Sequence, residues 1–244
     1  MLKVHAIQGT GVMGDFLNSL PVLSGLSKAY DCKIFLAVQG NLRTFNGMID
    51  LLKYQYMFED VVYDDEVTID VEYFKLTSWT RSTKNSEHRP IETSRYENFL
   101  NDTYDVSFEV DDDFVLEIPK IELDNDAADY VYIGDRWTTN IDMRRNCNII
   151  KDSGKYNDVK FRYLDYSQTM AYNAALMNKS KYPFISAITG ISVLANLMKK
   201  EQIVLYDDAM ITWDNRSSIM DTYNKHYYSN RNTRIEHIYT FNYA

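Results

Sequence analysis

The chain has 244 residues, a net charge of −9 and a hydrophobic fraction of 45%. That length fits one large domain or two small ones. No apolar run approaches the roughly 18 residues that cross a bilayer, which argues against a membrane span and for a globular protein. The N-terminal apolar run lacks a basic flank, so we expect no targeting segment and a cytoplasmic location, which is the host cytoplasm if the source is viral.

Charge is divided unevenly along the chain. Residues 1–126 carry 11 Lys and Arg against 23 Asp and Glu, a net charge of −12, whereas residues 127–244 carry 15 against 12, a net charge of +3. Cys32 and Cys147 could pair in an oxidising compartment, but without a signal peptide we expect free thiols. Neither cysteine has a Cys or His at metal spacing, so no structural zinc is expected.

Short apolar runs alternate with helical patterns in the first half. The predicted strands are 2–7, 32–38 and 60–65, and the predicted helices are 14–30, 42–54 and a segment near 102. Two further strands are predicted at 104–110 and 113–118. Alternation of this kind is typical of parallel strands joined by crossover helices.

The second half repeats this rhythm. The predicted strands are 129–135, 146–152, 158–164, 182–188 and 202–208, and the predicted helices are 167–180, 190–200 and 218–228. Residues 119–128 lack periodicity and contain Pro119, as expected of an interdomain linker. The sequence therefore predicts an α/β protein with two Rossmann-like domains, residues 1–126 and 127–244.

A glycine loop follows the first predicted strand. Gly9, Gly11 and Gly14 have the G-x-G-x-x-G spacing of a dinucleotide site. Such a site also needs an acidic residue at the end of the second strand, but the second strand here runs into Gln39 and Gly40. An NAD-dependent dehydrogenase is therefore a minor alternative.

The same stretch, HAIQGTGVMGDFLNSLPVLSGL, resembles the N-terminal loop of family 9 glycosyltransferases, the heptosyltransferase-like group. In that pattern a glycine loop leads into Gly-Asp, an apolar pair and then Leu-Pro. The matching residues are Gly11, Gly14, Asp15, Phe16, Leu17, Leu20 and Pro21. Another interpretation stays open, in which the glycines form only a tight turn and Asp15 only stabilises a helix N-terminus.

Residues 173–208 resemble the donor-binding region of the same family. The matching residues are Thr189, Gly190, Ile191, Ser192, Leu194 and Ala195. A helix N-terminus that contains glycine offers backbone N–H groups and a positive dipole end to a diphosphate. Ile188 and Val193 depart from the pattern, because the family usually has Asp and His there, so the donor contacts differ or activity is lost.

The resemblance implies a GT-B fold, in which two Rossmann-like domains face a cleft. It further implies an inverting glycosyltransferase that moves a sugar from a nucleotide-diphosphate sugar to a hydroxyl acceptor. Asp15 matches the family's catalytic base, which would take the acceptor proton. No cofactor or metal is expected, since the resembled fold is normally metal-independent. Asp111, Asp112 and Asp113 fit a hairpin turn better than a metal site.

Further binding residues follow from position. Donor binding is predicted for Arg136, Thr138, Thr139, Tyr163, Asp207 and the residues Thr189 to Ser192. Arg136 could instead be a surface residue, and Asp207 a turn residue. Acceptor binding is predicted for Gly11, Met13, Gly14, Arg81, His88 and Arg89.

The resemblance implies that the acceptor is a glycan of the lipopolysaccharide type. A modified base in DNA is a second possibility, because phage DNA glucosyltransferases also have GT-B architecture. Duplex DNA needs a basic face, whereas residues 1–126 carry −12. A rival hypothesis from another class is a non-catalytic protein that binds a sugar nucleotide or glycan. This hypothesis is based on the two departures from the family pattern, at Ile188 and Val193.

Overall fold

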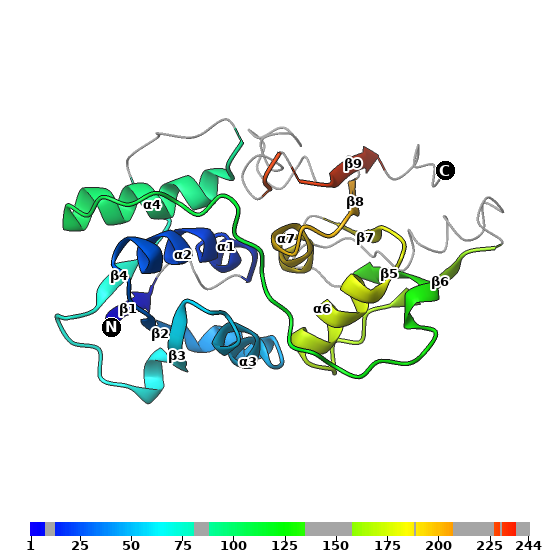
Figure 1. Cartoon of the computed structure of the whole chain (residues 1–244), viewed down its shortest axis with the longest axis horizontal. Helices are drawn as coiled ribbons and strands as arrows, with labels where there is room; N and C mark the ends of the chain where they lie inside the picture. Colours follow the sequence, from blue (N-terminus) through cyan, green and yellow to red (C-terminus); the bar gives the residue numbers. More distant parts are fainter. Residues whose placement is uncertain are drawn as a thin grey trace.

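The computed structural model describes residues 1–7, 13–80, 88–134, 158–187, 189–206, 227–229 and 231–237. Its strands form two parallel sheets, one of four strands and one of five (Figure 1). The four-stranded sheet lies in the blue and cyan part of the chain and the five-stranded sheet in the green to red part. This arrangement confirms the predicted α/β class.

The first sheet has the strand order β3-β2-β1-β4. Its members are β1 (Leu2–Ala6), β2 (Ile34–Val38), β3 (Phe58–Tyr63) and β4 (Phe74–Leu76). Val4, at the middle of β1, pairs with Leu36 on one side and Phe74 on the other. β4 was not predicted, because three residues are too short to show an apolar period.

The second sheet has the order β6-β5-β7-β8-β9. Its members are β5 (Tyr130–Gly134), β6 (Lys160–Tyr163), β7 (Phe184–Ala187), β8 (Gln202–Tyr206) and β9 (Thr233–His237). The buried runs of β7 and β8 are typical of strands covered on both faces. β9 was missed because its sequence, TRIEH, is mostly polar.

Helices connect these strands. The α-helices with described bounds are α1 (Met13–Leu17), α2 (Leu20–Ala29), α3 (Met48–Lys53), α4 (Ile91–Tyr104), α6 (Met170–Lys179) and α7 (Gly190–Leu197). Three short 3-10 turns are η1 (Gly40–Thr44), η2 (Asp64–Glu66) and η3 (Ala127–Asp129).

Two predicted helices are each broken in two. The helix expected at 14–30 is interrupted between Leu17 and Leu20, where Pro21 at the start of α2 lacks the N–H that a continuous helix needs. The helix expected at 42–54 is interrupted at Gly47, which has φ = 72°. The first segment, η1, ends at Thr44, and Gly47 directly precedes α3 in a left-handed conformation that favours glycine.

The strands predicted at 104–110 and 113–118 are wrong. α4 continues to Tyr104, and the following segment, residues 105–118, is extended without pairing to a strand. Its backbone instead bonds to α2, since Asp111 N donates to Pro21 O at 3.1 Å. The side-chain amide of Gln55 takes the place of a neighbouring strand, because it accepts from Glu117 N and donates to Glu117 O, both at 2.9 Å.

Other predicted elements lie outside the described residues. These are the strand at 146–152 and most of the helix at 218–228. The domain boundary after residue 126 stays a prediction. The strands of the first sheet end at Leu76, and those of the second begin at Tyr130.

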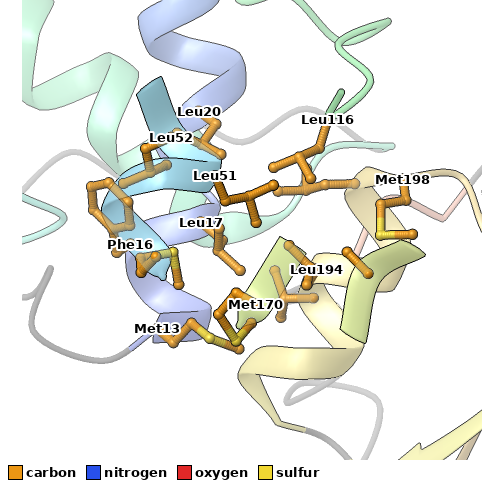
Figure 2. Close-up of a cluster of buried hydrophobic side chains, with 14 of the residues drawn as sticks. Met13, Phe16, Leu17, Leu20, Leu51, Leu52, Leu116, Met170, Leu194 and Met198 are labelled. Carbon is orange, nitrogen blue, oxygen red and sulfur yellow. The ribbon is translucent and has the colours of Figure 1, made fainter. Parts of the chain in front are cut away.

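One hydrophobic core runs through both sheets. It joins residues of α1 and α2 to residues of α6 and α7, and Figure 2 shows Met13 near Met170 and Leu194. Leu116 of the extended segment enters the same core, and its N–H donates to Leu197 O at 3.0 Å. The apolar side chains of the two halves therefore pack against one another in one cluster.

Glycines bring α1 and α7 into close contact at this interface. A Cβ on Gly190 would lie 2.6 Å from Met13 Cε, 2.8 Å from Met13 Cβ and 3.1 Å from Gly14 N. A Cβ on Gly14 would lie 3.4 Å from Gly190 Cα. Position 190 therefore has no room for a side chain, whereas a Cβ on Gly14 would make an ordinary van der Waals contact with Gly190.

Two further contacts cross between the halves. At the start of α6, Met170 N donates to Asn46 O at 2.7 Å, and Asn46 Nδ2 donates to Ser167 O at 2.9 Å. On another side, the buried Arg231 guanidinium donates to Asn196 O at 2.9 Å and to Phe114 O at 2.8 Å. Hydrogen bonds thus hold the halves together on either side of the α1–α7 contact.

Gly25→Ala tests the contact between α2 and the extended segment. A Cβ at this position would lie 2.1 Å from Glu109 O, which is backbone and cannot rotate away. We expect the free energy of unfolding to fall by about 1–3 kcal/mol, as for overpacked cores, in urea denaturation followed by circular dichroism. Gly40→Ala is the control, because its Cβ would meet only the ends of two side chains, Arg43 Nη1 at 2.8 Å and Asp65 Oδ2 at 3.6 Å, and no backbone atom. Equal losses in the two variants would contradict the assignment.

Gly190→Ala tests the contact between α1 and α7. The added Cβ would meet Met13, so we expect a loss of about 1–3 kcal/mol in the free energy of unfolding. Met13→Gly removes both atoms of that residue which crowd position 190. The double variant should therefore lose at least about 0.5 kcal/mol less than the two single losses added together. Strictly additive losses would show that the two residues do not press on one another.

Candidate functional site

Both sheets reverse their strand order at a point where ligands bind in open α/β proteins. The first sheet reverses between β1 and β4, and the second between β5 and β7. Ligands bind at the carboxyl ends of the strands beside such a point. The chain leaves β1 toward α1 and leaves β7 toward α7, so the two closely packed helix starts mark the candidate site.

Asp15 lies in the first turn of α1 and is half-buried. The Asp15 carboxylate lies near Tyr96 of α4, whose pKa it affects. Burial raises the pKa of Tyr96 well above its ordinary value, and the nearby carboxylates of Glu92 and Asp15 raise it further. A hydrogen bond with Ser78 lowers this pKa by a smaller amount. One carboxylate from α1, another from α4 and a hydroxyl that follows β4 therefore surround a single phenol.

This polar cluster is built on buried side chains. Ser78, Glu92 and Tyr96 are all buried, and Arg95 Nη1 lies 2.8 Å from the carboxylate of Glu92. The Tyr96 phenol is protonated at neutral pH and can donate a hydrogen bond, and its burial raises its pKa further. The half-buried carboxylate of Asp15 can accept a proton from a hydroxyl that reaches it.

Sequence reasoning missed Ser78, Glu92 and Tyr96. Glu92 and Tyr96 are four residues apart on one face of α4, but a Glu near a helix start is ordinarily a surface residue. Ser78 follows a strand that was too short to predict. Knowledge that β4 pairs with β1 would have placed Ser78 at the same edge of the sheet as α1, whereas the place of Glu92 and Tyr96 also depends on the packing of α4 against β4.

The start of α7 is held by its own capping bonds. Ser192 Oγ donates to Thr189 O at 2.6 Å and accepts from Thr189 N at 2.9 Å. Its hydroxyl has one proton, so Tyr227 OH, at 2.6 Å, is the donor in their contact. Ser192 is fully buried and serves the chain's own cap, while its predicted contact with a donor stays a prediction.

Two backbone N–H groups remain at this helix end. The N–H groups of Ser192 and Val193 both donate to Thr189 O at 3.1 Å. Helix geometry leaves the other first-turn groups, those of Gly190 and Ile191, without an intrahelical acceptor. The geometry is that of an anion-binding helix N-terminus, with Gly190 half-buried and in contact with Met13.

Val193 has a clear packing role. It is 2% exposed, and its Cγ2 would lie 3.5 Å from a Cβ on Gly14. The side chain that replaces the expected histidine therefore fills the interface between α7 and α1. A histidine would have to bury its polar ring there, which is costly without a partner.

His88 and Arg89 lie at a junction with the C-terminal segment. Arg89 donates from Nε and Nη2 to Asp112 at 2.7 and 2.6 Å and from Nη1 to Glu97 at 2.5 Å. His88 Nδ1 lies 3.3 Å from Ser229 Oγ. The structure gives both residues internal partners, and their contact with an acceptor stays a prediction.

Tyr163 is half-buried at the end of β6, an edge strand, where it pairs with Ile133 of β5. Several other predicted site residues lie outside the described part of the chain. They are Gly11, Arg81, Arg136, Thr138, Thr139, Ile188 and Asp207.

The described residues contain no group of three or more His, Cys, Asp and Glu that could hold a metal ion. Asp111 bonds to Lys28 Nζ at 2.7 Å, and Asp112 is paired with Arg89, so neither carboxylate is directed at a common centre. Across the same described ranges, no helix is long and apolar enough to cross a membrane.

A cavity lies at the opposite end of α7 from Gly190. Its volume is about 130 Å³, and it is lined by Asp112, Asp113, Lys199, Arg231 and Asn232. Sites for ligands of drug size measure about 300–1,000 Å³. The cavity is therefore too small to be the site for a nucleotide sugar.

Comparison with known proteins gives different results for sequence and for structure. No protein-family model matches the sequence, and no curated protein sequence matches it significantly. The structure of Escherichia coli heptosyltransferase WaaC with ADP is similar, with a TM-score of 0.59 and 12% identity over 97% of this chain and 93% of that one.

Two further structures are similar. A family 9 glycosyl transferase from Veillonella parvula gives a TM-score of 0.58 at 12% identity, over 96% of this chain and 85% of the other. The dodecameric iron-containing glycosyltransferase TibC from enterotoxigenic E. coli gives 0.50 at 12% identity, over 84% of this chain and 57% of the other. The protein therefore has the two-sheet architecture of GT-B glycosyltransferases, in a form structurally similar to family 9, as the sequence predicted.

Proposed function

We propose that this protein is an inverting glycosyltransferase that moves a sugar from a nucleotide-diphosphate sugar to a hydroxyl acceptor. The observation that carries the proposal is the contact between two helix starts on a GT-B fold. The start of α1 bears a half-buried carboxylate, Asp15, and the start of α7 bears two backbone N–H groups suited to a diphosphate.

In the proposed reaction Asp15 takes the proton of the acceptor hydroxyl. The acceptor oxygen forms its bond to the anomeric carbon as the bond from that carbon to the diphosphate oxygen breaks. The nucleoside diphosphate leaves with that electron pair, and attack from the opposite face inverts the anomeric centre. The neutral Tyr96 phenol helps to position the side chains around the Asp15 carboxylate.

The donor is assigned to the half of the chain that holds the second sheet. The N–H groups of Gly190 and Ile191 would receive the diphosphate, in which negative charge develops as it leaves. The remaining donor contacts rest on the family resemblance, namely Arg136, Thr138, Thr139, Tyr163, Thr189, Ser192 and Asp207. We propose residues 1–126 as the acceptor domain and 127–244 as the donor domain.

A second candidate is a non-catalytic protein that binds a sugar nucleotide or glycan. Two observations favour this candidate. Val193 fills the interface where the family usually has a histidine, and Ser192 is fully used by internal hydrogen bonds. The chain would then have kept the fold and replaced polar donor contacts by packing.

Nucleotide binding distinguishes both candidates from an unrelated function. Ligands that bind the folded state raise the melting temperature, by an amount that grows with concentration relative to Kd. ADP is the first compound to test because the similar WaaC structure contains it, followed by UDP, GDP, CMP, their sugars and NAD. At 100 times Kd, one of the diphosphates should stabilise the fold by about 2.7 kcal/mol. A shift with NAD alone, or with none of them, would contradict the proposal.

Asp15→Asn then separates the enzyme from the binder. Loss of a general base lowers turnover by about 10²–10⁴-fold, so the variant should lose donor turnover while it keeps the nucleotide-induced thermal shift. Asp50→Asn is the matched control, because Asp50 is also in the first turn of a helix but is exposed. If both variants turn over at the wild-type rate, Asp15 only stabilises its helix. If the wild type binds without turnover, the protein is a binder.

A further inference from the structure

Trp79 is an exposed aromatic residue beside the candidate site. It follows β4 by three residues, and 67% of its surface is accessible, whereas Thr77 and Ser78 directly before it are buried. Tryptophan is a large and mostly apolar residue, so this exposure leaves a substantial apolar surface in contact with water.

The backbone beneath the indole is fixed. Trp79 N donates to Thr77 Oγ1 at 3.1 Å, and Thr80 N donates to Ser78 O at 3.1 Å. β4 itself is paired with β1, and Ile7 N donates to Leu76 O at 2.9 Å. Binding at this position therefore does not require the backbone to become ordered, and the cost of ordering falls on the indole side chain alone.

The position of Trp79 ties it to the candidate site. It lies at the carboxyl end of β4, beside the point where the first sheet reverses its strand order. The adjacent Ser78 hydrogen-bonds to Tyr96, the phenol whose pKa the Asp15 carboxylate helps to raise. Trp79 is therefore the next residue along the chain after a member of the polar cluster that holds the proposed base.

The chemistry of the surroundings selects the ligand. One face of a pyranose ring presents C–H groups that can cover an indole ring, while the sugar hydroxyls and the indole N–H remain able to form hydrogen bonds. A polyanion is disfavoured, because residues 1–126 carry 23 acidic and 11 basic residues.

We propose that Trp79 is a stacking platform for a sugar ring of a saccharide acceptor. The inference rests on the proposed function, since it assigns the acceptor class to that same site. The ring would lie on the indole and direct a neighbouring hydroxyl toward Asp15. Trp79 thereby sets the preference for a saccharide over a base in DNA.

The test uses the full chain on an array of immobilised neutral oligosaccharides, with the nucleotide that gives the largest thermal shift, or without nucleotide if none does. Trp79→Ala should weaken saccharide binding at least tenfold, and Trp79→Phe should retain most of it. Tyr54→Ala is the matched control, because Tyr54 is an exposed aromatic residue at the end of α3, and it should bind as the wild type does. All three variants should keep the wild-type melting temperature and nucleotide-induced shift.

Each outcome decides between the two proposals. Binding by Trp79→Ala equal to that of the wild type, or no saccharide binding by the wild type, overturns the platform, whether or not nucleotides bind. Saccharide binding that depends on Trp79 without any nucleotide shift supports the platform and overturns the transferase. Trp79-dependent retention of a duplex with hydroxymethylcytosine, in place of saccharides, would assign the indole to a DNA base.

Discussion

The close packing of α1 against α7 is the constraint on which the rest of the structure depends. Gly190 lets the two helix starts approach to a distance at which its own Cβ would crowd Met13 and the backbone of Gly14. This contact brings the carboxyl edges of two separate parallel sheets to one place. Without it, Asp15 and the start of α7 would belong to two unrelated sites.

The same contact explains why glycines that look functional in the sequence also have a packing role. Gly190 is the first residue of a helix whose N–H groups suit an anion, and the Met13 side chain packs where a Cβ of Gly190 would lie. Val193 also has a packing role, because its buried side chain contributes apolar surface where a polar side chain would require a hydrogen-bond partner. Recognition and packing thus share residues at this interface.

Charged side chains connect the two halves of the chain as well as forming part of the candidate site. Arg89, Asp112 and Arg231 join α4, the extended segment and the C-terminal part of the chain. Burial lowers the pKa of Arg231, yet guanidinium stays charged in proteins, so its donors remain available for the carbonyls they meet. The acidic run at 111–113 is therefore largely part of a structural connection.

The sequence by itself determined the alternation of strands and helices, the α/β class, the two-part organisation of the sheets and the resemblance that names the fold. These features follow from local apolar periods and from short glycine motifs, which act within about twenty residues. The sequence also singled out Asp15 and Gly190, because both match motifs of the resembled family and both stand at the start of a predicted helix.

Only the tertiary structure decided which polar residues meet. Ser78, Glu92 and Tyr96 come from segments far from Asp15 in the sequence, and the pairing of the short β4 with β1 together with the packing of α4 against β4 brings them together. The extended segment after α4 resembled strands because alternating apolar residues suit any extended backbone. It found its partners in Pro21, Gln55 and Leu197. Local pattern sets the conformation of a segment, whereas packing between distant segments decides its partners and therefore its chemistry.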